Sequence, residues 1–118
     1  MSVMPLLKLE TTILPSEDKR KTLLASLSKA VAGAIEKPEQ YVMVTISQAA
    51  IFMSGKPGDA AFVDLRSIGG LSGDVNKKLS QQVCKLLTDS LGIPPDRVYL
   101  NFAEIEASNW GWNGNTFG

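Results

Sequence analysis

The stretch PDRVYLNF at residues 95–102 repeats the pattern of PEQYVMVT at residues 38–45, at an offset of 57 residues. In both, a proline and polar residues lead into a run of apolar and polar side chains, which predicts a turn followed by a strand. The segments before the two stretches also correspond. The sequence therefore predicts two successive β-α-β units, each with a right-handed crossover and two parallel strands.

The expected elements follow from the spacing of apolar residues. We expect strands at 6–12, 41–48, 61–68 and 97–105, and helices at 16–36 and 73–91. Ser16 is a suitable N-cap for the first helix, and Gly92 before Pro94 is a normal end for the second. Two amphipathic helices can cover one face of a four-stranded sheet. The fold class is α+β, with a four-stranded mixed sheet, two helices on one face and short edge strands in a single domain, 1–118.

The composition limits the possible chemistry. The chain has 118 residues, no histidine, and 12 Lys+Arg against 12 Asp+Glu. Without histidine, a zinc site or a Ser-His-Asp triad is excluded, and the single Cys84 cannot form an intrachain disulfide. Because neither charge sign is clustered and no long apolar run occurs, we expect no nucleic-acid partner and no membrane partner. The missing histidine also leads us to expect no metal. The expected location is cytoplasmic.

The sheet face opposite the helices bears on assembly. Segments 49–53 and 108–112 are rich in large apolar side chains and look like short strands that no helix remains to cover. Exposed edges and aromatic residues favour pairing with another subunit, so homo-oligomerisation is the preferred interpretation. A simply solvated face is the alternative.

Four separated motifs carry a family resemblance. They are KPEQYV at 37–42, SIGG at 67–70, PDRVYLNF at 95–102 and NWGWNGNTF at 109–117. The chain from Pro5 to Gly118 resembles the macrophage migration inhibitory factor (MIF) family of the tautomerase superfamily. The resemblance implies a MIF-like homotrimer with active sites between subunits. It also implies cofactor-free keto-enol tautomerisation of phenylpyruvate, hydroxyphenylpyruvate and dopachrome-like compounds.

The resemblance assigns the catalytic role to Pro5. A proline at the start of a chain is a secondary amine, which can act as general base and then as general acid. Within a chain, the same proline is a non-basic amide and can simply begin an edge strand. By resemblance, Lys37 binds the carboxylate of an aromatic 2-keto acid and the backbone N–H of Ile68 binds the same group. The structural alternatives are a surface lysine at a helix end and an ordinary core isoleucine.

The remaining predicted substrate-binding residues lie near the C-terminus. By resemblance, Tyr99 and Asn101 project from one strand face into the pocket of a neighbouring subunit, where Asn101 binds the distal hydroxyl of the substrate. Trp112 and Phe117 form the apolar wall, and Trp110 narrows the pocket relative to the smaller aliphatic residue of familiar members. A polar pair on a solvated sheet face is the alternative for Tyr99 and Asn101.

Two further departures from the family pattern affect function. Residues 1–4 precede Pro5, and we expect this extension to be absent from the mature protein, since it would block the amine. The Cys-x-x-Cys pair of some animal members is replaced by Ala60 and Val63, so their proposed thiol-disulfide activity is not expected. The competing functional class is a MIF-like cytokine or binding protein with a vestigial pocket. Such a protein can also leave the cell without a signal peptide.

Overall fold

A computed structural model of the chain describes residues 4–118. The predicted extension at 1–4 therefore lies outside the described residues, apart from Met4. The α+β fold class is confirmed, and the described residues form four long strands, two long helices and two very short strands.

The central sheet has the strand order β2-β1-β3-β4. Its strands are β1 (Leu6–Thr11), β2 (Met43–Gln48), β3 (Ala61–Ser67) and β4 (Val98–Glu104). The pairs β1·β2 and β3·β4 are parallel, as two β-α-β units require, and the units join through the antiparallel pair β1·β3. The sheet is therefore mixed, as predicted.

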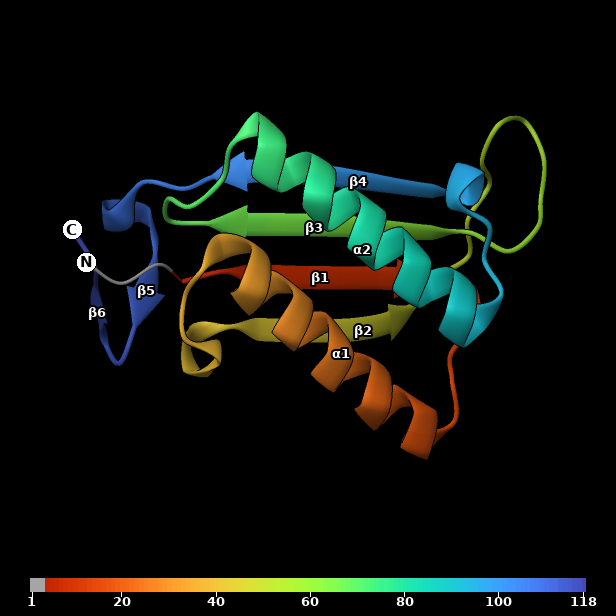
Figure 1. Ribbon diagram of the computed structural model, residues 1–118, viewed down its shortest axis with the longest axis horizontal. Helices are drawn as coiled ribbons and strands as arrows, with labels where there is room; N and C mark the ends of the chain where they lie inside the picture. The colour runs from red at the N-terminus through yellow and green to blue at the C-terminus, as the bar shows by residue number, and fades with distance from the viewer. Residues whose placement is uncertain (1–3) are drawn as a thin grey trace.

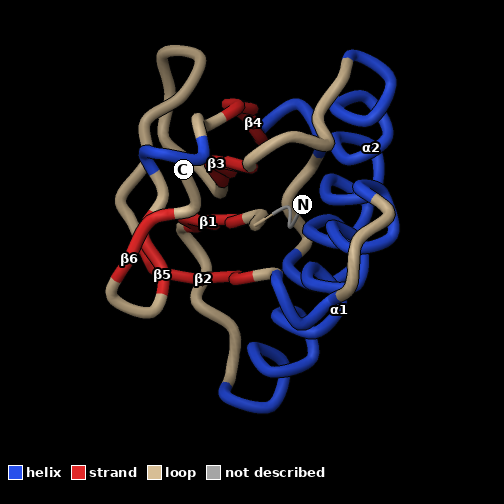
Figure 2. The backbone as a smooth tube through the Cα atoms, turned by 90° about the vertical axis from the view of Figure 1, so that its left-hand side faces the viewer, coloured by secondary structure: helices blue, strands red, loops and turns tan. Residues whose placement is uncertain are grey.

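The helices α1 (Glu17–Ile35) and α2 (Gly73–Leu91) cross the same face of the sheet (Figure 1). Ser16 caps α1 by accepting a hydrogen bond from Lys19 N at 3.5 Å, and Ser72 caps α2 by accepting one from Val75 N at 3.2 Å. Gly92 ends α2 in the left-handed region, at φ 71°. Figure 2 shows both helices on one side of the sheet and none on the other.

The hydrophobic core lies between the helices and the sheet. The odd-numbered residues of β1 and β3 face the helices, and Leu7, Leu9, Val63 and Leu65 are fully buried there. Leu23, Leu27 and Val31 of α1 and Leu79, Val83 and Leu87 of α2 complete this layer. Burial of each such side chain stabilises the fold by roughly 1.5–3 kcal/mol before the entropy cost is subtracted.

The prediction of a strand at 49–53 is wrong. Only Met53 makes a strand-like contact, an isolated bridge to Lys56. At the end of this segment and in the residues after it, carbonyl groups are bound instead by a buried arginine. Arg97 follows Pro95 in the short 3-10 helix η2 (Pro95–Arg97) and donates hydrogen bonds to carbonyl oxygens between residues 53 and 59. A side chain here replaces a neighbouring strand as the hydrogen-bond partner.

The predicted strand at 108–112 is correct only at its end. Residues Ala107–Asn109 form the 3-10 helix η3, and β5 (Gly111–Trp112) pairs with β6 (Asn115–Thr116) in an antiparallel hairpin. Asn113 and Gly114 link the two strands with φ angles of 54° and 77°. An Asn-Gly pair with two positive φ angles is the favoured two-residue hairpin turn.

Candidate active site between sheet end and C-terminal hairpin

Several elements meet at one end of the sheet (Figure 1). Because β1 runs antiparallel to β3 and β4, the start of β1 lies beside the ends of those two strands. The β5-β6 hairpin lies at the same end, on the side of the sheet away from the helices (Figure 2). This end of the molecule therefore gathers segments from both termini of the chain.

Pro5 occupies the residue before β1 at this end. It is buried, and its carbonyl accepts a hydrogen bond from Met43 N at 3.0 Å. Because Pro5 lies at the strand's beginning, its lack of an N–H costs no hydrogen bond of the sheet. In the chain as it stands, the Pro5 nitrogen is bonded to Met4 and is a non-basic amide. The hydrogen bond to Met43 thus holds the backbone of Pro5 in place. The nitrogen of Pro5 is basic only if the chain begins at this residue.

Lys37 and Ile68 come to the same end from two other elements. Lys37 follows the left-handed residue Glu36 at the end of α1, and its backbone N–H bonds Ala32 O at 3.1 Å. Ile68 follows β3 and is buried, just before the two positive-φ glycines at 69 and 70. The end of α1 sets the chain direction at Lys37, and the turn at Gly69 and Gly70 sets it at Ile68.

Tyr99 and Asn101 lie elsewhere in the same chain. Both are exposed on the open face of β4. Tyr99 pairs with Phe62 of β3, and Phe62 pairs with Glu10 of β1. Glu10 lies five positions along β1 from Pro5. At about 3.3 Å per residue, that separation is roughly 16 Å along the sheet. One chain therefore does not bring Tyr99 to Pro5, and a site that uses both residues needs a second subunit.

The C-terminal hairpin brings the predicted aromatic residues together. The rings of Trp112 and Phe117 stack with centroids 5.9 Å apart and an interplanar angle of 11°. Phe117 N donates to Trp110 O at 3.2 Å, which fixes the third aromatic residue beside the pair. Trp112 is 61% exposed, which is unusual for so large an apolar surface. The hairpin thus presents an aromatic surface to the outside of the subunit.

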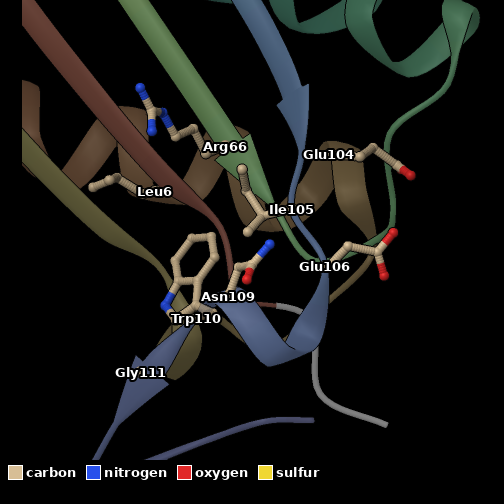
Figure 3. Close-up of a pocket in the computed structure, with 8 residues that line it drawn as sticks. All are labelled: Leu6, Arg66, Glu104, Ile105, Glu106, Asn109, Trp110 and Gly111. Atoms are coloured by element: carbon tan, nitrogen blue, oxygen red, sulfur yellow. The ribbon is translucent and has the colours of Figure 1, made fainter.

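A cavity of about 540 Å³ lies between the hairpin and the sheet end (Figure 3). Leu6, Ile105 and Trp110 give it an apolar side. The other lining residues are the polar or small ones Arg66, Glu104, Glu106, Asn109 and Gly111. Of the predicted site residues, only Trp110 lines this cavity. Pro5 does not line it, but the next residue in the chain, Leu6, does.

Arg66 is the functional candidate that the sequence prediction missed. Its guanidinium donates from Nε and Nη2 to Asp64 Oδ2 at 3.2 and 3.1 Å, and the side chain is 53% exposed. Arg66 pairs directly with Leu6 across the sheet. Strand alternation from buried Leu65 and Ser67 could have placed it on the open face. The cavity residues after β4 have no comparable pattern, since they belong to short, irregular segments between β4 and the hairpin.

Three other features of the described residues bear on function: the thiol, the potential metal ligands and the apolarity of the helices. Burial raises the pKa of the Cys84 thiol on α2, which disfavours the nucleophilic thiolate. Between residues 4 and 118, no cluster of acidic, cysteine or histidine side chains has the arrangement of a metal site. No helix in that part of the chain combines the length and apolarity needed to cross a membrane.

Comparisons with known proteins agree with this architecture. The family model described as Macrophage migration inhibitory factor (MIF) matches residues 4–118. A macrophage migration inhibitory factor homolog from Trichuris trichiura is 42% identical over 115 residues, covering 97% of this chain and 100% of the relative. The crystal structure of a MIF-like protein from Entamoeba histolytica superposes with a TM-score of 0.92 at 32% identity, covering 97% and 99% of the two chains. The structure of a MIF homologue from Prochlorococcus marinus gives a TM-score of 0.90 at 36% identity, covering 96% and 99%. The chain belongs to the macrophage migration inhibitory factor family.

Proposed function

We propose that this chain is a cofactor-free keto-enol tautomerase of phenylpyruvate, hydroxyphenylpyruvate and dopachrome-like compounds. Pro5 is its general base and acid, after residues 1–4 have been removed. The observation that carries the proposal is the position of Pro5, which is buried at the start of β1 and directly precedes Leu6, a residue that lines a cavity with an apolar side. The match of the family model from residue 4 onward gives further support.

The chemistry follows from the properties of an α-amine. Such an amine has an ordinary pKa of about 7.7–8.0, and burial lowers it by disfavouring the charged form. A terminal Pro5 would then be largely neutral near pH 7 and could take a proton from the carbon next to the substrate carbonyl. Once protonated, it returns that proton to the enolate oxygen, and the reverse sequence gives ketonisation. No redox step or cofactor is needed.

Binding would use the groups at the same end of the sheet. In the proposal, the ammonium of Lys37 and the backbone N–H of Ile68 hold the substrate carboxylate. The aromatic ring packs against Trp110, Trp112 and Phe117, which exclude water from the proton-transfer site. Charge-assisted contacts to the carboxylate would orient the carbon that loses its proton toward Pro5.

We further propose that the working site forms in a homotrimer. The separation of Tyr99 from Pro5 supports this, because a neighbouring subunit can supply Tyr99, and Asn101 from the same strand face, to the pocket. Met43, Phe52, Tyr99 and Trp112 are each more than 60% exposed, as expected for surfaces that a second copy covers. The alternative is a monomer with a solvated sheet face. It predicts that specific activity does not depend on protein concentration.

A matched pair of proteins tests the amine. The first begins at Pro5 and the second begins at Ser2, so both contain the whole described fold from residue 5. We expect ketonisation of hydroxyphenylpyruvate, followed by the loss of enol absorbance, to be at least about 100-fold faster for the first. In the first protein, Pro5→Gly should lower the rate strongly while the oligomer persists. Equal rates for the two chain starts, or full activity of Pro5→Gly, would remove Pro5 from the mechanism.

A mixing experiment tests the shared site. Pro5→Gly subunits and Asn101→Ala subunits, each impaired alone, are unfolded, mixed and refolded together. If the site combines Pro5 of one subunit with Asn101 of another, mixed oligomers contain some intact sites and activity rises above that of either variant. No recovery in oligomers shown by native mass spectrometry to be mixed would place both residues in one subunit's site.

A second candidate is a cytokine-like binding protein with an inherited but unused pocket. The name shared by the relatives describes an effect on cell migration rather than a reaction. For this function, we propose cytoplasmic synthesis with release by a route that uses no signal peptide. The two candidates separate if Pro5→Gly removes tautomerisation and leaves the effect on cells unchanged.

A further inference from the structure

Arg66 is a cationic group in the cavity that the proposed mechanism does not use. It pairs across the sheet with Leu6, the residue that follows Pro5. Directly opposed residues in an antiparallel pair have Cα atoms about 4.5–5.5 Å apart. The Cα atom of Arg66 therefore lies opposite that of Leu6, one residue along β1 from the proposed base Pro5. The Arg66 side chain lies on the open side of the sheet.

The charges around the cavity are separated. In Figure 3 the Arg66 guanidinium extends to the side of Leu6, whereas the carboxylates of Glu104 and Glu106 point to the opposite side. Glu104 Oε1 also accepts a hydrogen bond from Leu71 N at 3.4 Å, which directs it toward the loop after β3. The positive charge therefore stands on the side of Leu6, away from Glu104 and Glu106, and against the carboxylate of Asp64 (Figure 3).

The contact with Asp64 orients the guanidinium without using all its donors. Asp64 Oδ2 accepts from Nε and Nη2, and this contact leaves the donors of Nη1 available to a ligand. Asp64 holds the planar group in place, as required for directional binding of a carboxylate. The arrangement combines an oriented cation with the apolar side chains of Leu6, Ile105 and Trp110.

We propose that Arg66 binds a second anionic group of the substrate, so that this site favours arylpyruvates that carry a further carboxylate. This inference rests on the proposed tautomerase function and names its substrate class. Lys37 and Ile68 hold the 2-keto carboxylate, Arg66 holds the second carboxylate, and the aryl ring lies against Trp110. A neutral hydroxyl at the same position gains only the weaker contact of an uncharged acceptor.

Two substrates and two variants test this. The substrates are the enols of 4-carboxyphenylpyruvate and 4-hydroxyphenylpyruvate, and the protein begins at Pro5. We expect Arg66→Gln to lower kcat/KM for the carboxy substrate by roughly ten- to a hundred-fold, mainly through KM, since one charge-assisted contact is lost. The value for the hydroxy substrate should stay within about two-fold. Lys8→Gln is the matched control, because Lys8 is an exposed cation on the same sheet face that does not line the cavity.

The outcomes separate this inference from the proposed function. Specific binding by Arg66 is refuted if Arg66→Gln lowers kcat/KM equally for both substrates. It is also refuted if Lys8→Gln lowers kcat/KM for the carboxy substrate as much as Arg66→Gln does. In either case the proposed tautomerase function remains. If the unmodified protein turns over neither substrate, the proposed function fails. Calorimetric titration with the keto form of 4-carboxyphenylpyruvate then decides the binding claim alone, because Arg66→Gln must still weaken binding and Lys8→Gln must not. Circular dichroism checks that each variant is folded.

Discussion

The buried Arg97 offers a sharp test of what holds the loop after β2. Its guanidinium donates to Met53 O at 2.7 Å, to Asp59 O and Gly58 O at 3.2 Å, and to Lys56 O at 3.5 Å. Arg97 is only 8% exposed. The perturbation is Arg97→Lys, which keeps the charge and most of the chain length but removes the planar fork.

The expected cost follows from these contacts. A single lysine nitrogen cannot reach all the carbonyls that surround the guanidinium. Of the three bonds at 2.7 and 3.2 Å, we therefore assume that one remains in the variant. Loss of the other two at about 1–1.5 kcal/mol each gives a destabilisation of about 2–3 kcal/mol. With a urea m-value of about 1–3 kcal/mol/M, the unfolding midpoint should fall by roughly 0.7–3 M.

The assay is urea unfolding followed by circular dichroism, at one fixed protein concentration because assembly adds to apparent stability. Hydrogen exchange should show faster exchange at residues 53–59 in the variant. Arg66→Lys, an exposed arginine, is the control and should change stability by less than about 0.5 kcal/mol. An unchanged midpoint and unchanged exchange in Arg97→Lys would refute the view that Arg97 organises this loop.

Three further predictions concern the core, the thiol and the hairpin. Leu27→Ala, at a fully buried position of α1, should destabilise the protein by about 3–5 kcal/mol in the same urea assay, and a cost under about 1 kcal/mol would contradict the assigned core. Because burial raises the pKa of Cys84, iodoacetamide should alkylate Cys84 more slowly than glutathione at pH 8. The rise of the alkylation rate with pH should also occur at higher pH for Cys84 than for glutathione. Equal pH profiles would contradict this. Gly114→Ala places a side chain at φ 77°, so it should cost about 1–2 kcal/mol in the hairpin and alter the fluorescence of Trp112, whereas an unchanged spectrum and stability would count against the turn.

Most of the fold could be predicted because local signals agree with the packing. The helix predicted at 73–91 is observed at Gly73–Leu91, since Ser72 and Gly92 mark its ends independently of any tertiary contact. The parallel pairing within each unit followed from the β-α-β order. The segment 49–53 was misassigned because its apolar residues gave a strand-like composition. The carbonyl of Met53 accepts instead from the side chain of Arg97, 44 positions away, which no local pattern reveals.

The candidate site was predicted less completely. The Asn113-Gly114 pair carried a hairpin signal that could have placed Trp112 against Phe117 from the sequence. Arg66 was accessible to strand alternation, but its proximity to Leu6 depends on the register of β1 against β3, which the sequence did not fix. The distance from Tyr99 to Pro5 likewise became clear only from that register. The catalytic roles of Pro5, Lys37 and Ile68 remain predictions.

The intact mass of the protein isolated without a tag from its own cells tests the central claim most directly. A chain that begins at Pro5, lighter than the full sequence by Met1 through Met4, is the predicted result, because only that chain has a secondary amine at the start of β1. A mass that retains Ser2 and the residues after it would contradict the claim, since the nitrogen of Pro5 would then be an amide with no proton to exchange.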